Sequence, residues 1–231
     1  MSHPVNDSDT LRRLERAIAG VQGRVAAGCD RAGRPPEEVR LIGVAKGVPG
    51  AMVAQAARAG LGEFGENYVQ ELVTKRELVP DAAWHFIGRL QHNKVPRLLD
   101  AADVVHTLEP GRAAERLAHL AEERGRPVDC LVEVDFTGAR VGVAPEAAEA
   151  FVERMVRSPG VRVRGLMTVA PLGEDPRPAF VKLRELRDRL GERYQDVREL
   201  SMGMSTDLEA AVEEGATMVR VGTAIFGPRG R

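Results

Sequence analysis

Eight short apolar runs alternate with amphipathic segments along almost the whole chain, and this alternation restricts the fold more than any other feature of the sequence. Short apolar runs are typical of buried strands, whereas apolar residues at every third or fourth position are typical of helices. Strands that alternate with helices indicate a parallel sheet. The runs lie near residues 39–45, 62–65, 83–88, 103–108, 128–135, 161–169, 197–202 and 217–222.

The segments between the runs carry the helical pattern, and one further helix precedes the first run. In that leading segment, 11–31, residues Leu14, Ile18, Val21 and Val25 share one face. The other helices are predicted at 51–59, 68–78, 113–124, 147–157, 179–194 and 208–214.

Eight strand and helix units predict a single (β/α)₈ barrel with an extra N-terminal helix. The 231 residues form one domain, 1–231, with a flexible tail at 1–8. An open doubly wound sheet is the alternative. Its dinucleotide-binding version loses support because no G-x-G-x-x-G motif follows the first run.

Composition excludes several classes of function. Lys and Arg number 33 against 34 Asp and Glu, a balance that gives no reason to expect a nucleic-acid or acidic-membrane partner. Two cysteines are too few for a disulfide framework, and the histidines do not recur at metal-ligand spacing. No apolar run approaches the ~18 residues of a membrane span. We therefore expect a soluble, cytoplasmic protein without a metal, and the charged outer helices favour a monomer.

Lys46 stands out because it ends the first apolar run and is followed at once by Gly47 and Pro49. A lysine at the tip of a buried strand is costly unless its amine reaches solvent, pairs with an acid, or does chemistry. Burial lowers the pKa of an amine and makes it a nucleophile toward aldehydes. Lys46 is thus a candidate for Schiff-base chemistry.

Two Gly-containing turns follow the seventh and eighth runs. Ser201 and Gly203 lie in the first, and Gly222 and Thr223 lie in the second. Backbone N–H groups at such turns bind phosphate, and barrels commonly build a phosphate site from the loops after strands 7 and 8. Two ordinary capped turns are the alternative. We call these four residues the phosphate cradle.

Barrel closure brings these clues together, because strand 1 pairs with strand 8 in a closed barrel. Lys46 would then lie beside the phosphate cradle, as a ligand with an aldehyde and a phosphate requires. Pyridoxal phosphate fits, and so does a sugar phosphate bound by a Schiff-base aldolase. Arg220, two residues before Gly222, would face a pyridine nitrogen as a pure donor and weaken the ring as an electron sink, unless it pairs with a neighbouring acid.

Asn67 follows the second run and His85 lies in the third, so both are predicted at the same rim. Either could contact the ring or its 3'-oxygen. His85 is equally explained as a core histidine with satisfied hydrogen bonds, and Asn67, with Glu66, as a helix cap.

These features together resemble the pyridoxal phosphate homeostasis protein family, itself similar to the N-terminal barrel of alanine racemase. The resemblance implies that Lys46 carries the cofactor as an internal aldimine, that the phosphate cradle surrounds its phosphate, and that Arg220 faces the pyridine nitrogen. The stretches that carry it are Val44-Ala45-Lys46, Phe64 to Glu71, Trp84 to Gly88 with Leu90-Gln91 and Asn93-Lys94, Gly165-Leu166-Met167, Leu200 to Ser205 with Asp207, and Arg220 to Gly227.

Two stretches depart from the family pattern. The family often has Ser-Lys-Thr where this chain has Ala45-Lys46-Gly47, which removes two hydroxyls beside the lysine. The fifth strand often ends with Asn, but here it ends with Glu133 and Asp135. Polar contacts of the family at these two places are not carried over.

The resemblance implies a pyridoxal 5'-phosphate-binding protein that maintains vitamin B6 homeostasis without substantial turnover, and so not an enzyme. The partners it suggests are the cofactor and apo forms of pyridoxal-phosphate enzymes. Alanine racemase needs a second base, a tyrosine from an extra domain, and neither Tyr68 nor Tyr194 is expected to replace it. The alternatives are a racemase or lyase using the same cofactor and, more distantly, a cofactor-free aldolase.

Overall fold

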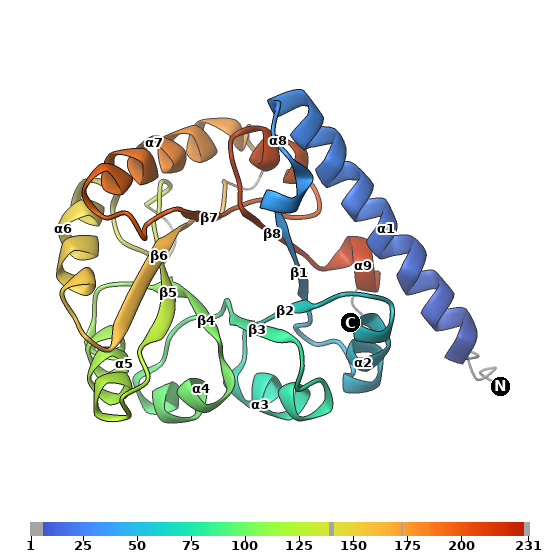
Figure 1. The fold of residues 1–231 in the computed structure, drawn as a ribbon, viewed down its shortest axis with the longest axis horizontal. Helices are drawn as coiled ribbons and strands as arrows, with labels where there is room; N and C mark the ends of the chain where they lie inside the picture. Colours follow the sequence, from blue (N-terminus) through green and yellow to red (C-terminus); the bar gives the residue numbers. More distant parts are fainter. Residues whose placement is uncertain (1–6, 139–140, 172, 229–231) are drawn as a thin grey trace.

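Eight parallel strands close into a barrel surrounded by helices, as a computed structural model describes for residues 7–138, 141–171 and 173–228 (Figure 1). The strand order is sequential, and β1 pairs with β8 to close the ring. The predicted (β/α)₈ barrel is therefore confirmed, and the open sheet is excluded. The strands are β1 (Arg40–Val44), β2 (Glu63–Glu66), β3 (Ala83–Phe86), β4 (Val104–Leu108), β5 (Val128–Glu133), β6 (Val161–Met167), β7 (Glu199–Ser201) and β8 (Met218–Val221).

The helices lie outside the ring of strands and alternate with the strands along the chain. Two 3-10 helices, η1 (Pro36–Glu38) and η2 (His92–Lys94), join the elements around them. The α-helices are α1 (Asp7–Ala32), α2 (Gly50–Arg58), α3 (Val69–Leu78), α4 (Val95–Ala101), α5 (Arg112–Glu123), α6 (Pro145–Val156), α7 (Arg177–Arg193), α8 (Leu208–Glu213) and α9 (Thr223–Phe226).

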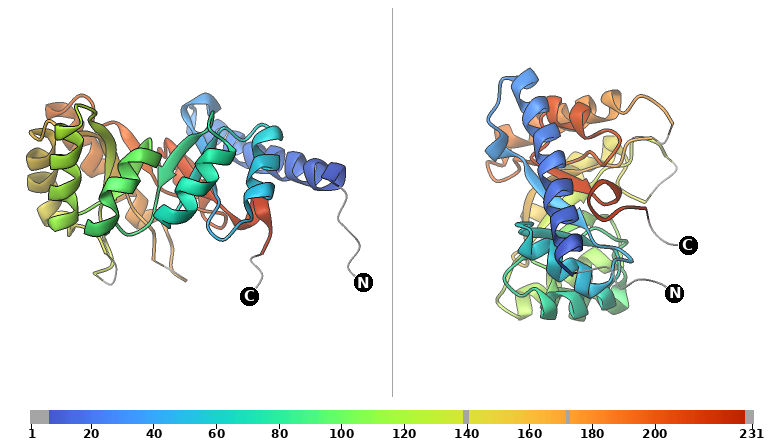
Figure 2. Two further views of the ribbon diagram at one scale, coloured as in Figure 1. Left: turned by 90° about the horizontal axis from the view of Figure 1, so that it is seen from below. Right: turned by 90° about the vertical axis from the view of Figure 1, so that its right-hand side faces the viewer.

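The leading helix α1 is longer than the sequence pattern predicts, beginning at Asp7 rather than residue 11. It crosses the outside of the barrel against α8, α9 and α2 (Figures 1 and 2). The predicted tail at 1–8 falls mostly outside the described residues, and the part that is described, Asp7 and Ser8, is helical.

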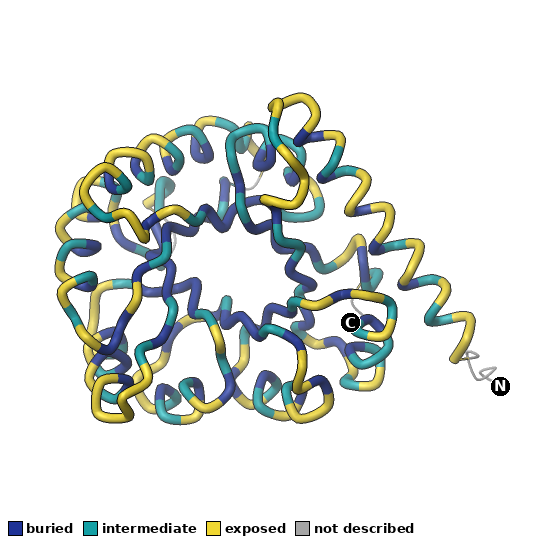
Figure 3. The backbone as a smooth tube through the Cα atoms, in the orientation of Figure 1, coloured by how far each residue is buried: buried dark blue, intermediate teal, exposed yellow. Residues whose placement is uncertain are grey.

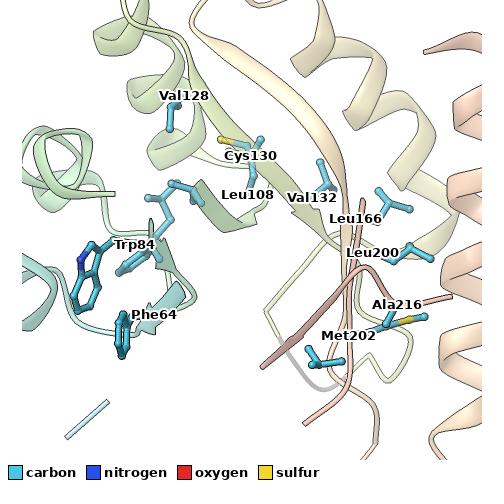
Figure 4. Packing of buried hydrophobic residues seen from close by; sticks show 14 of the residues in the cluster. Phe64, Trp84, Leu108, Val128, Cys130, Val132, Leu166, Leu200, Met202 and Ala216 are labelled. Carbon is cyan, nitrogen blue, oxygen red and sulfur yellow. The ribbon is translucent and has the colours of Figure 1, made fainter. Parts of the chain in front are cut away.

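Most of the hydrophobic core lies between the strands and the helices, so buried segments form the inner ring and exposed ones the outer rim (Figure 3). Phe64 and Trp84, on the outer faces of β2 and β3, stack with ring centroids 5.2 Å apart (Figure 4). Removing either ring would cost roughly 3–5 kcal/mol, because large-to-small changes leave a cavity.

The interior of the barrel is packed differently, because apolar and polar side chains share it. Ile42, Leu131, Met167 and Met218 form a small apolar cluster there. Buried polar residues occupy the rest, among them His85, His106, Ser201 and Arg220. The interior is therefore a place where polar side chains must find partners within the protein.

Candidate cofactor-binding site

Lys46 lies in the turn directly after β1, at the end of the barrel where strands give way to helices. Its side chain is half-buried, and its Nζ lies 5.5 Å from the centre of the Tyr68 ring. The turn is tight, with the Val48 N–H donating to the Ala45 carbonyl over 2.9 Å and Gly47 at φ 68°. The amine thus stands at the rim, with an aromatic face beside it.

The loops after β7 and β8 meet at the same end of the barrel. Gly203 has φ 91°, and a Cβ there would lie 2.5 Å from the Ala211 side chain, so glycine is required. The Ser205 hydroxyl lies 3.1 Å from the Thr223 hydroxyl and joins the two loops. Gly222 directly precedes Thr223, the first residue of α9. Three predicted cradle residues, Gly203, Gly222 and Thr223, therefore lie together.

Ser201, the fourth predicted cradle residue, points into the barrel. Its side chain is fully buried, and its Oγ lies 2.9 Å from His106 Nδ1 and accepts a 2.6 Å hydrogen bond from Arg220. Ser205 is the hydroxyl that reaches the rim, which the sequence reasoning missed. Its place two residues after Gly203, beyond the end of the strand, is the signal that could have found it.

Arg220 comes from β8 and is almost fully buried beneath the cradle. One guanidinium nitrogen donates to Ser201 Oγ and another to the Thr168 carbonyl over 2.9 Å, while its backbone N–H donates to the Gly203 carbonyl. Arg220 on β8 pairs with Ile42 on the neighbouring strand β1, and Lys46 lies in the turn that follows β1. Strand pairing thus brings the lysine and the arginine to one end of the barrel.

His106 and His85 continue the contacts of Arg220 deeper into the barrel. Burial, reinforced by His85 and the charges of Arg220 and Arg40, holds the pKa of His106 well below its usual value, so the ring is neutral. His106 Nε2 lies 2.9 Å from His85 Nδ1, and His85 Nε2 lies 2.9 Å from a Glu63 carboxylate oxygen, although that last pair is not aligned as a hydrogen bond. We call Arg220, Ser201, His106 and His85 the histidine chain.

Hydrogen bonds join the members of the histidine chain one after another. Arg220 can only donate, so the Ser201 oxygen accepts from it. The Ser201 hydroxyl and His106 Nδ1 form the next bond, and His106 Nε2 and His85 Nδ1 form the one after, with the donor in each set by the histidine tautomers. His85 is fully buried inside the barrel and bonded to His106, while its Nε2 lies beside Glu63 without an aligned hydrogen bond.

A cavity of about 450 Å³ opens at this end of the barrel. Asn67 and Thr107 lie on its wall, and Asn67 donates a long 3.5 Å hydrogen bond to the Ile87 carbonyl. Its volume lies within the range of ~300–1,000 Å³ typical of small-molecule sites. The remaining lining residues are Ile87, Gly88, Arg89, Glu133, Val141, Met167, Val169 and Arg220.

A larger hollow of about 530 Å³ lies at the opposite end, between the starts of strands β4, β5 and β6. Ligands of such barrels bind at the carboxyl ends of the strands. Asn67 and Arg220 line the smaller cavity, and the Lys46 turn and the phosphate cradle lie at the same end of the barrel, so we assign the site to that end.

A buried group of charged residues supports the rim from outside the barrel wall. Lys75 of α3 lies between Glu66 at the end of β2 and Glu71 one turn earlier in α3, with Nζ to oxygen distances of 2.5 and 2.6 Å. Burial raises the pKa of Glu66, opposed by Lys75. Burial also acts to raise the pKa of Glu71, but hydrogen bonds from Lys75 and the Gly47 N–H outweigh it and leave that pKa below its usual value. We call these three residues the ionic cluster, which the sequence reasoning did not identify.

The leading helix α1 secures the Ser205 loop. The Arg24 guanidinium donates to the Ser205 carbonyl over 2.9 Å and to both carboxylate oxygens of Glu209 over 2.6 and 2.7 Å. The loop after β7 is therefore fixed by a residue almost two hundred positions earlier in the chain.

The described part of the chain holds neither a metal-binding cluster nor a membrane-spanning helix. Residues 7–138, 141–171 and 173–228 contain no group of three or more His, Cys, Asp or Glu arranged to hold a metal ion. In the same described stretches, no helix has the length and apolar character needed to span a membrane.

Comparison with known proteins adds a family to this geometry. The profile of the alanine racemase N-terminal domain matches residues 30–230. A pyridoxal phosphate homeostasis protein of Aquifex aeolicus (strain VF5) is 42% identical over 229 residues, covering 96% of this chain and 99% of that protein.

Two solved structures extend the likeness to three dimensions. A protein of unknown function from Bifidobacterium adolescentis superposes with a TM-score of 0.90 at 31% identity, covering 97% of this chain and 98% of its own. PipY of Synechococcus elongatus PCC7942, determined with PLP bound, has a TM-score of 0.81 at 36% identity and covers 93% and 100% of the two chains.

Proposed function

This chain belongs to the pyridoxal phosphate homeostasis protein family, and we propose that it holds pyridoxal 5'-phosphate covalently on Lys46 and maintains vitamin B6 homeostasis without substantial catalytic turnover. One observation carries the proposal. Because β1 pairs with β8, the amine of Lys46 and the loops with Gly203 and Thr223 lie at one end of the barrel. The PLP bound to the relative PipY supports the identity of the ligand.

The residues at the rim suit this cofactor. When bound, pyridoxal phosphate supplies an aldehyde that an amine can capture and a ring that draws electrons from it. Lys46 would hold the aldehyde end, and the Ser205 and Thr223 hydroxyls with the backbone at Gly203 and Gly222 would hold the phosphate. The adjoining cavity of about 450 Å³ supports this fit.

Two features support binding without turnover. Arg220 would present donors to the ring nitrogen and leave the ring a weak electron sink, because a guanidinium stays protonated. Racemisation also needs a base opposite the lysine. Tyr68 contacts Lys46 itself, so its position beside the amine supports a role on the lysine side of the ligand.

The test is the colour and mass of the purified protein. We expect the wild-type chain to be yellow and Lys46→Ala to be colourless after incubation with the cofactor. Borohydride reduction followed by peptide mass analysis should find a pyridoxyl group on Lys46. Equal colour in both proteins would remove the assignment of Lys46, and a sugar-phosphate adduct would establish the aldolase instead.

A racemase or lyase with the same cofactor is the second candidate, and Tyr68 is the side chain that it would have to use as a second base. Its ring lies 5.5 Å from Lys46 Nζ, on the lysine side of the ligand. Exchange of an amino acid's α-proton in deuterated water separates the two functions. Sustained exchange that needs both Lys46 and Tyr68, lost in Tyr68→Phe, would establish the enzyme.

We also propose that apo forms of pyridoxal-phosphate enzymes receive the cofactor, and that the protein is a cytoplasmic monomer. Loaded protein mixed with an apo-enzyme should activate it faster than the cofactor dissociates on its own. Equal rates would show release without direct transfer, and sedimentation of the loaded protein would report the oligomeric state.

A further inference from the structure

Two lysines, Lys46 and Lys75, lie close to the rim, and the amine of Lys75 makes three hydrogen bonds within the protein. Lys75 Nζ donates to the Ala45 carbonyl over 2.7 Å, to Glu66 over 2.5 Å and to Glu71 over 2.6 Å. An ammonium group has three N–H donors, so every one of them has an acceptor. The whole donor capacity of the Lys75 amine is therefore used within the protein.

The two carboxylates carry these bonds onward to the backbone on either side. Glu71 accepts from the Gly47 N–H over 3.1 Å. Glu66 accepts from the N–H groups of Asn67 over 2.7 Å and Tyr68 over 3.3 Å. The ionic cluster therefore holds the residues before and after Lys46 together with Asn67, which lines the cavity, and Tyr68, whose ring lies beside the Lys46 amine.

The position of the cluster gives these bonds their strength. The Lys75 side chain is 7% exposed and that of Glu66 is fully buried. Charge-assisted hydrogen bonds away from solvent are stronger than neutral ones. Ala45 is thus held by a buried charge and Gly47 by Glu71, whose side chain is 36% exposed, although neither Ala45 nor Gly47 contributes a side chain that could anchor the turn.

We propose that Lys75 and Glu71 are positioning residues for Lys46. They set the backbone of its turn and thereby the direction of its amine, and they engage every N–H donor of Lys75 within the protein, which leaves Lys46 as the amine that captures the aldehyde. The capture of the cofactor rests on the function proposed above, whereas the fixing of the turn does not.

The experiment compares Glu71→Ala with Glu71→Gln. Glu71→Ala removes the acceptor for Gly47 but leaves Lys75 its fully buried partner Glu66, so the fold should persist. Glu71→Gln keeps an oxygen that can accept from Gly47 and serves as the conservative rescue. Glu153→Ala is the matched control, because Glu153 also pairs with a basic residue four positions later, on the exposed helix α6.

Two readouts are needed. Amide hydrogen exchange at Gly47 in the cofactor-free protein should become about 10- to 100-fold faster in Glu71→Ala, as expected for the loss of a hydrogen bond to a charged group. The rate of aldehyde capture by Lys46, followed with pyridoxal and with pyridoxal phosphate, should fall about tenfold or more because the amine loses its orientation. Glu71→Gln should stay within about threefold of wild type in both, and Glu153→Ala should match wild type.

Three results would overturn the proposal. The first is wild-type exchange at Gly47 in Glu71→Ala, the second is an unchanged capture rate in that variant, and the third is a pyridoxyl group found on Lys75 of the reduced wild-type protein. Failure of the wild-type chain to bind any pyridoxal compound would refute the proposed function instead, and the Gly47 exchange would still test the positioning.

Discussion

The ionic cluster and the histidine chain support the same rim by opposite means. The ionic cluster lies outside the barrel wall, where Lys75 balances one of two carboxylates. The histidine chain lies inside the wall, where Ser201 and a neutral His106 connect Arg220 to His85 by hydrogen bonds. The first holds backbone through charge, and the second holds a guanidinium through a hydroxyl that is itself bonded to a neutral ring.

The comparison teaches that buried polar groups can be stable for different reasons. Removing one member of a buried ion pair leaves an uncompensated charge, which is costly. Removing one member of a neutral chain leaves an unpaired dipole, which costs less. Three changes test this contrast.

The largest effect is expected from Lys75→Met, which keeps the length of the side chain and removes its charge. Glu66 and Glu71 would lose their shared cation, so the free energy of unfolding should fall by about 3–5 kcal/mol. Urea denaturation measures the change. Lys182→Met, an exposed lysine on α7, is the control and should be close to neutral. A loss below about 1 kcal/mol would mean that the carboxylates find other partners.

A smaller effect is expected from Ser201→Ala, which interrupts the histidine chain without removing a charge. Arg220 would lose one acceptor and His106 the hydrogen-bond partner of its Nδ1, so stability should fall by about 1–3 kcal/mol. Urea denaturation measures this loss, and the absorbance of bound cofactor should shift because the guanidinium is less well held. An unchanged spectrum together with full stability would show that the Ser201 hydroxyl plays no part in holding Arg220.

The smallest effect is the change of stability with pH, which separates the contribution of the neutral His106 ring from that of the ionic cluster. His106 has a lowered pKa in the folded protein, so below its ordinary value of 6.5 the unfolded chain binds a proton that the folded chain does not. Stability from His106 is therefore fully present above pH 6.5 and falls by up to about 1.4 kcal/mol per pH unit below it.

His106→Gln should remove this part of the slope, whereas His119→Gln, on the exposed face of α5, should keep it. Denaturation series from pH 7 to pH 5 give the slopes. The pH dependence that Glu71 contributes lies below this range, because its pKa in the folded protein is below the usual 4.5. Stability from Glu71 is present above that value and lost as the pH falls through the lowered one. Identical slopes in the wild type and His106→Gln would contradict the neutral state of His106.

Much of the fold follows from the pattern of apolar residues, and the two helices that the pattern did not predict have local causes. Each predicted strand lies within about three residues of the observed one, because buried strands are short apolar runs bounded by turns. Helix α4 was not predicted, since seven residues with Pro96 at the second position show little periodicity. Helix α9 is shorter still, with four residues.

The place of a residue at the rim could be predicted where a single strand end decides it, as it does for Lys46 and Gly203. Ser201 and Ser205 are harder to separate, because side chains alternate between the two faces of a strand and the exact end of β7 decides which hydroxyl reaches the rim. The ionic cluster joins residues of β2 and α3 and contacts the turn after β1, and its geometry depends on tertiary packing that no single segment encodes.

The contact between Arg24 and the Ser205 loop has a consequence for the order of events during synthesis. Arg24 leaves the ribosome early, whereas its partner Glu209 lies 185 residues later, and β8 must follow before β1 has a neighbour on its open side. A nascent chain carries Lys46 long before it can form the loops that surround it. The growing polypeptide should therefore remain unable to retain the cofactor until synthesis has passed Thr223, which makes loading a post-translational event.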